Sequence, residues 1–148
     1  MRLLLFTLMA VVSLQADVYK AVYDLSTSEM RYLHNRVQLI QKTAEMVRKN
    51  GDTPVFVITI HSGATPILAK MPDMYAKEQD VPVIYGIHET LQKLHDDFDV
   101  RVLGCDLATA AYGMEPDELL PFVERTRNSI IDLIKLQNDG YAAVYFVR

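Results

Sequence analysis

The sequence predicts a three-layer α/β domain, in which a mostly parallel sheet of five strands carries helices on both of its faces. Short apolar runs rich in β-branched and aromatic residues alternate along the chain with amphipathic segments of helical periodicity, which is typical of βαβ units. Several of these runs are apolar throughout, as in strands that are covered on both faces. The chain has 148 residues, half of them hydrophobic, and this length fits one domain with one core.

The expected elements follow one another in a regular order. The residues predict strands at Val18–Leu25, Pro54–His61, Val100–Gly104, a short one from Phe122, and Tyr141–Val147. They predict helices at Met30–Lys49, Tyr85–Phe98, Leu107–Gly113 and Ile130–Gln137. Asn128-Ser129 fits the start of the last helix, and Asn50-Gly51 fits the end of the first. The strand from Phe122 is the element that its residues define least, because charged residues follow at once.

The first sixteen residues predict a secretory signal peptide, which leaves residues 17–148 as the mature domain. Met1-Arg2 is a short basic start, residues 3–14 are almost wholly apolar, and Ala16 offers a small residue before the polar Asp17. The apolar run is shorter than the roughly 20 residues that span a bilayer. We therefore expect an exported, periplasmic protein with no membrane association after cleavage of the peptide.

Composition and motifs exclude several classes of partner. The formal net charge of −4 argues against nucleic acid and anionic membranes, which both reward clustered Lys and Arg. Neither G-x-G-x-x-G nor G-x-x-x-x-G-K-[ST] is present, so dinucleotide and nucleoside triphosphate cofactors are not supported. His88 and His95 do not match H-E-x-x-H, and there is no C-x-x-C. We expect neither a cofactor nor a metal.

Cys105 is the only cysteine, so an intrachain disulfide is not possible. It follows the expected strand Val100–Gly104 and precedes a helix, whose amide groups and dipole would stabilise the thiolate that attacks or carries sulfur. Gly104 would keep the approach to the thiol open. Asp106 opposes the thiolate charge unless its own charge is used to cap the helix. The alternative is an inert, buried cysteine.

A second group of candidates follows the strand Pro54–His61. Ligands of parallel sheets bind at the carboxyl ends of the strands, so His61 is expected at the same crevice as Cys105. His61 can orient a substrate or accept a proton, and Ser62-Gly63 with the following amides can form an anion-binding nest. The alternative is a strand-end histidine bonded to a loop. We take Cys105 as the candidate catalytic residue, and the candidate substrate-binding residues are His61, Ser62, Gly63 and Asp106.

Three segments of the chain resemble the DsrE/DsrF-like family, in its small exported single-domain branch. Val57–Gly63 resembles the family's strand ending in His-Gly, Val100–Cys105 its strand leading to a cysteine, and Ser129–Ala142 its closing helix, turn and strand. There are two departures from the family's pattern. Asp106-Leu107 replaces an Asn-containing continuation after the cysteine, and Arg125–Ser129 replaces a more neutral turn.

The resemblance implies a parallel five-stranded domain that assembles as a trimer or hexamer, and a cysteine that carries persulfide sulfur between proteins. A homo-oligomer with a sulfur donor or acceptor protein as its partner is therefore expected. The leading hypothesis is an exported persulfide carrier or sulfurtransferase-like protein acting through Cys105. One alternative is a non-catalytic oligomeric module of the same fold that binds a small ligand or a protein. A thiol redox sensor is a third, weakened by the lack of a resolving cysteine.

Overall fold

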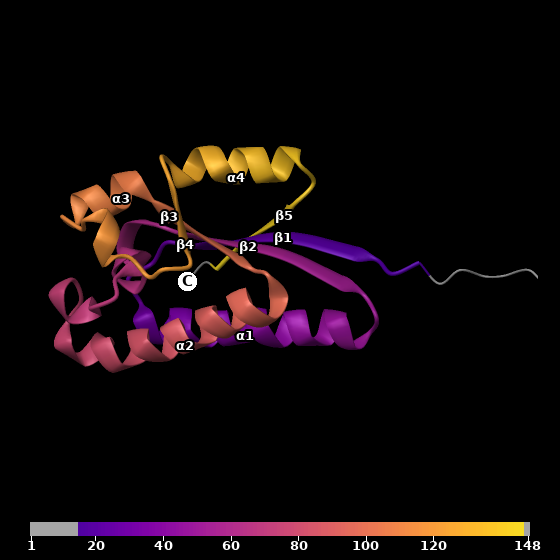
Figure 1. Cartoon of the computed structure of the whole chain (residues 1–148), viewed down its shortest axis with the longest axis horizontal. Helices are drawn as coiled ribbons and strands as arrows, with labels where there is room; N and C mark the ends of the chain where they lie inside the picture. Colours follow the sequence, from indigo (N-terminus) through magenta and orange to yellow (C-terminus); the bar gives the residue numbers. More distant parts are fainter. Residues whose placement is uncertain (1–14, 147–148) are drawn as a thin grey trace, which may run out of the picture.

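The computed structural model describes residues 15–146, in which five strands and four α-helices alternate (Figure 1). Residues 1–14 lie outside this range, so the signal peptide and the start of the mature domain at residue 17 stay predictions. Between residues 15 and 146, no helix has the length and the apolar character needed to cross a membrane.

The five strands of the described sheet are all parallel, in the order β4-β3-β2-β1-β5. Their bounds are Val18–Leu25 (β1), Thr53–Ile60 (β2), Arg101–Cys105 (β3), Val123–Thr126 (β4) and Ala142–Tyr145 (β5). Leu25 pairs with Ile60, and Ile60 pairs with Gly104. The carboxyl ends of β1, β2 and β3 are therefore level along one edge of the sheet.

Helices cover both faces of the sheet, which confirms the predicted three-layer fold. The α-helices are Met30–Lys49 (α1), Val81–Phe98 (α2), Asp106–Ala111 (α3) and Ser129–Asn138 (α4). Figure 1 shows α1 and α2 on one side of the sheet, and α3 and α4 on the other. Short 3-10 helices link the main elements at Ser62–Leu68 (η1), Pro72–Met74 (η2), Glu78–Asp80 (η3) and Pro116–Glu118 (η4).

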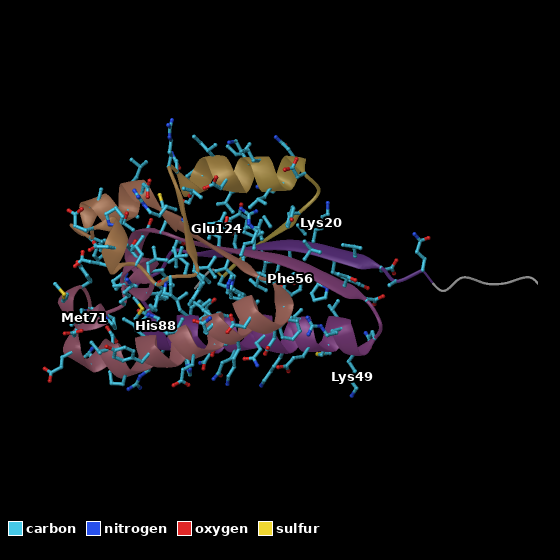
Figure 2. All side chains as sticks on the ribbon, viewed as in Figure 1. Lys20, Lys49, Phe56, Met71, His88 and Glu124 are labelled. Atoms are coloured by element: carbon cyan, nitrogen blue, oxygen red, sulfur yellow. The ribbon has the colours of Figure 1, made fainter. Side chains whose placement is uncertain are left out.

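The alternation of side chains along the strands divides the core between the two faces. The larger cluster fills the space between the sheet and the α1–α2 layer, and it includes Phe56, which Figure 2 labels. The smaller cluster packs α4 on the opposite face of the sheet, and its members are Val22, Val57, Leu103, Leu133 and Leu136. Residues that share the strand parity of Val22, Val57 and Leu103 therefore face the α4 side.

Helix α2 is longer than the sequence predicts, whereas the predicted short strand near Phe122 is present as β4. Helix α2 begins at Val81 rather than at Tyr85, because Pro82 fits the first turn of a helix, where its missing N–H is not needed. Strand β4 forms in spite of its charged residues because it is an edge strand, where charges are tolerated. Its Glu124 accepts a hydrogen bond from the Arg101 guanidinium of β3 at 2.6 Å, which lowers the pKa of the Glu124 carboxyl.

Candidate functional site

The carboxyl edge of the sheet collects polar side chains from three neighbouring strands. Asp24 shares its strand face with Val22, and Thr59 shares its face with Val57, so both point to the α4 side. Cys105 follows the same rule from Leu103 on β3. Three strands thus place an acid, a hydroxyl and a thiol on one face, close to one edge.

Asp24 is the centre of a buried hydrogen-bonded group. The residue is only 9% exposed, and its Oδ1 accepts from the Thr59 hydroxyl at 2.9 Å. The same Oδ1 lies 2.9 Å from Nε2 of His61, which immediately follows β2. A buried carboxylate is costly unless its hydrogen bonds are satisfied, and these two partners satisfy Oδ1. Sequence reasoning missed Asp24, although an acid near the end of an otherwise apolar strand was the available signal.

The second ring nitrogen of His61 bonds to the next residue. Nδ1 lies 2.8 Å from the hydroxyl oxygen of Ser62, whose side chain reaches the surface. Ser62 has φ +52, a left-handed conformation that a non-glycine residue rarely adopts. Such a conformation persists only where its surroundings hold it, and it often accompanies function.

The backbone beyond Ser62 does not provide the expected anion nest. The amide of Gly63 donates to the carbonyl of Ser26 at 3.0 Å, and the amide of Ala64 donates to the carbonyl of His61 at 3.1 Å. Both N–H groups are therefore used inside the protein. The roles of Ser62 and Gly63 in binding a substrate stay predictions, and any anion in this place would have to use other donors.

Cys105 is the last residue of β3 and the N-cap of α3, as its sequence position predicts. It is 4% exposed, and its thiol makes no side-chain capping hydrogen bond. Because Ile60 pairs with Gly104, and His61 continues β2 in an extended conformation, His61 and Cys105 occupy adjacent positions on neighbouring strands. The ring nitrogens of His61 nevertheless bond to Asp24 and Ser62, so neither is directed at the thiol in this conformation.

Asp106, the next residue after Cys105, forms an ion pair with Arg125 of β4. The Arg125 Nε donates to Asp106 Oδ1 at 2.9 Å. The negative charge of Asp106, which would oppose a thiolate, is thus paired with the cation Arg125. It is this ion pair, and not a cap on the helix, that offsets the charge. Both side chains also line a cavity of about 410 Å³ beside α3, with Thr109, Met114 and Leu119 on its walls.

Gly104 does not keep the approach to the thiol open, and that expectation is wrong. A Cβ on Gly104 would lie 2.9 Å from Cγ1 of Val123 and 3.1 Å from Cδ1 of Leu68. A side chain at position 104 would have to displace Val123 or Leu68, because β4 and η1 pack closely against the strand. Gly104 therefore serves the packing beneath the site rather than access to it.

The two remaining candidates from the metal motifs, His88 and His95, bond to backbone carbonyls. The Nε2 of His88 lies 2.8 Å from the carbonyl of Ile67, and burial lowers the pKa of the His88 imidazole. The Nδ1 of His95 lies 3.3 Å from the carbonyl of Val100. Within residues 15–146, no group of three His, Cys, Asp or Glu side chains is placed to hold a metal ion.

The family model described as "DsrE/DsrF-like family" matches residues 20–146, which covers most of the domain described above. The chain belongs to the DsrE/DsrF-like family. This family is associated with sulfur relay in general. The match includes the whole candidate site, from Asp24 on β1 to Arg125 on β4.

Two relatives of this DsrE/DsrF-like chain bear on its fold and its extent. An uncharacterized protein of Aquifex aeolicus (strain VF5) is 34% identical over 135 residues, which are 88% of this chain and 57% of the relative. The chain therefore spans little more than half the length of that relative. The structure of MTH1491, a protein of unknown function from Methanobacterium thermoautotrophicum, superposes with a TM-score of 0.67 at 15% identity. The superposition covers 86% of this chain and 99% of MTH1491. A likeness at 15% sequence identity supports the fold alone.

Two residues from the segments expected to depart from the family pattern contact each other in space. Asp106 follows Cys105, and Arg125 lies on β4. Their side chains form the ion pair across β3 and β4. The rim beside Cys105 is therefore charged, and the Asp106 carboxylate in it is paired with a cation.

Proposed function

We propose that this protein carries sulfane sulfur as a persulfide on Cys105, as an exported member of its family. The observation that carries the proposal is the place of Cys105 at the carboxyl end of β3, in the position adjacent to His61. The family's association with sulfur relay and the pairing of Asp106 with Arg125 support it. The burial of Cys105 would shield a bound persulfide from water.

The proposed transfer balances without a cofactor. The Cys105 thiolate attacks the outer sulfur of a donor persulfide, R–S–S–H. A new S–S bond to Cys105 forms as the donor's S–S bond breaks, and the donor leaves as the thiolate R–S⁻. A thiolate acceptor later attacks the sulfur held by Cys105 and restores the free cysteine. The donor and the acceptor are proposed to be proteins.

The test is the intact mass of the protein after incubation with polysulfide, before and after treatment with reductant. We expect a gain of one or more sulfur atoms that reductant removes, and no gain in Cys105→Ser. Thr109→Ser is the matched control, since it alters a buried residue of α3 but keeps the thiol. No gain in the unsubstituted protein, with a thiol that also resists alkylation while folded, would refute the proposal. The same spectra test the proposed export, since cleavage after Ala16 leaves Asp17 as the first residue.

A second candidate function is a non-catalytic binding module. It is favoured by one observation: the cavity of about 410 Å³ is lined by Asp106 and Arg125 and does not include Cys105. In this alternative, the ion pair at the rim selects the ligand and the cysteine only fills space. A protein that never gains sulfur but keeps its fold would favour this function.

We also propose that the chain forms a homo-oligomer, a trimer or a hexamer, through the outer face of α4. Ile130 and Ile134 lie one turn apart on that face and are 55% and 54% exposed, and Ile131 beside them is 48% exposed. Three half-exposed isoleucines on one short helix are a feature of an interface. Association of two copies of the protein through these isoleucines would cover the apolar face of α4.

The oligomer is tested by light scattering coupled to gel filtration. We expect a mass of three or six chains for the unsubstituted protein. The double variant Ile130→Arg, Ile134→Arg should shift to a smaller species, because it brings like charges into the contact. Leu39→Arg on the outer face of α1, 45% exposed, is the matched control and should keep the larger mass. A monomeric mass for the unsubstituted protein would rule the proposal out.

A further inference from the structure

Asp24, His61 and Ser62 form an unbroken chain of hydrogen bonds from the core to the surface. The Asp24 carboxylate is buried, the His61 side chain is 14% exposed, and the Ser62 side chain is exposed. The links are 2.9 Å from Asp24 Oδ1 to His61 Nε2, and 2.8 Å from His61 Nδ1 to Ser62 Oγ. Thr59 fixes the inner end with its own hydrogen bond to Oδ1 at 2.9 Å.

The chemistry of these groups gives the chain a direction. An ionised carboxylate can only accept hydrogen bonds, so Nε2 of His61 must carry the hydrogen that it donates to Asp24. In the neutral ring, Nδ1 is then an acceptor, and Ser62 donates its hydroxyl hydrogen to it. The outward side of the Ser62 oxygen therefore presents lone pairs. It is suited to a ligand that brings a hydrogen of its own.

We propose that this hydrogen-bonded chain is a proton acceptor for a protic sulfur group, the S–H of hydrogen sulfide, a thiol or a hydropersulfide. The choice of a sulfur ligand rests on the proposed sulfur function. The direction of the hydrogen-bonded chain does not, because it follows from the donors and acceptors of Asp24, His61 and Ser62. The S–H proton moves to Ser62 Oγ while the proton of Ser62 moves to His61 Nδ1. No bond between heavy atoms changes, the ligand is left as its sulfur anion, and Asp24 stabilises the imidazolium.

Asp24 is thus a positioning residue, and Ser62 is the residue that touches the ligand. The backbone supports this arrangement, because Ser62 is held at φ +52 between His61 and a glycine that packs against Ser28. A Cβ on Gly63 would lie 2.6 Å from the Ser28 amide nitrogen. The loop that presents the Ser62 hydroxyl therefore has little freedom to turn it away from His61.

The experiment follows the ring nitrogens of His61 by NMR in the full, 15N-labelled chain carrying Cys105→Ser, titrated with sodium hydrosulfide at constant pH. Without sulfide, we expect a neutral ring with its hydrogen on Nε2. Sulfide should convert this signal to the doubly protonated ring. The variant His61→Gln assigns the signal. Ser28→Ala removes a nearby hydroxyl that is not part of the hydrogen-bonded chain, and it should respond as the Cys105→Ser protein does.

Two variants distinguish proton transfer along the hydrogen-bonded chain from a merely structural role of these side chains. Ser62→Ala should keep the Nε2 hydrogen but lose the response to sulfide. Asp24→Asn keeps an oxygen that can accept from Thr59 and from Nε2, but it removes the negative charge that stabilises the imidazolium, so it should also lose the response. The proposal is overturned if His61 of the Cys105→Ser protein holds its hydrogen on Nδ1, if sulfide leaves this ring neutral, or if Ser62→Ala responds fully. Since the cysteine is absent throughout, these outcomes are distinct from failure of Cys105 to carry sulfur.

Discussion

The substitution Leu68→Ala is expected to lower the free energy of unfolding by about 2–5 kcal/mol, the range for emptying a well-packed leucine site. Leu68 is fully buried at the end of η1, and its Cδ1 lies 3.1 Å from the place where a Cβ on Gly104 would be. Its backbone carbonyl also accepts from Leu120 at 2.9 Å, which fixes the segment in place. The surroundings therefore cannot collapse easily into the space that the side chain leaves.

The measurement is urea unfolding followed by circular dichroism, with Leu39→Ala as the control. Leu39 is 45% exposed on α1, so the same chemical change should alter stability by less than about 0.5 kcal/mol there. Equal destabilisation by the two substitutions would contradict the close packing of η1 beneath β3. The comparison also matters for the site, because η1 begins at Ser62 and carries the loop that follows His61.

The regular elements could be predicted from the sequence because their signals are local. The apolar residues of α1 recur at helical spacing, and the structure begins and ends that helix at the predicted residues, Met30 and Lys49. The cap of α4 is local as well, since Asn128 Oδ1 accepts from the amide of Ile130 at 2.9 Å. The edge strand β4 was harder, because its residues lack the apolar run that marks the central strands.

The candidate site could be predicted only in part, because its contacts join distant residues. Cys105 and His61 could be found because each follows a recognisable strand. Asp24 bonds to a histidine 37 residues away, and only the parallel register of β1 and β2 brings them together. The pair of Asp106 and Arg125 likewise depends on β4 pairing with β3. No pattern within a short window of sequence encodes such pairings.

The site consists of two halves that share one edge of the sheet. One half is the proton-accepting chain on β1 and β2, and the other is Cys105 with the charged rim of Asp106 and Arg125 on β3 and β4. The backbone register places the halves side by side, while their side-chain hydrogen bonds keep them separate. A sulfur ligand that contacts both Ser62 and Cys105 would join them, which is why the two halves are tested separately above.

The substitution Gly63→Ala is expected to lower the free energy of unfolding by about 1–3 kcal/mol, the usual cost of forcing an extra carbon into a packed site. The new Cβ would lie 2.6 Å from the amide nitrogen of Ser28, 2.9 Å from its Cβ and 3.0 Å from its Cα. Two of these atoms are backbone, which cannot turn away as a side chain can. The loops after β1 and β2 are also tied by the Gly63 to Ser26 hydrogen bond, so relief requires breaking that contact.

The matched control is Gly86→Ala in the interior of α2, measured by the same urea unfolding. Its Cβ would approach Nε2 of His34 at 3.0 Å, which is the far end of a flexible side chain. Alanine also favours the helix over glycine by about 0.5–1 kcal/mol, so this substitution should be neutral or stabilising. If Gly63→Ala proves as harmless as Gly86→Ala, the two loops are not in close contact. The Ser62 hydroxyl would then be free to leave His61, and the hydrogen bond between Ser62 and His61 would lose its structural support.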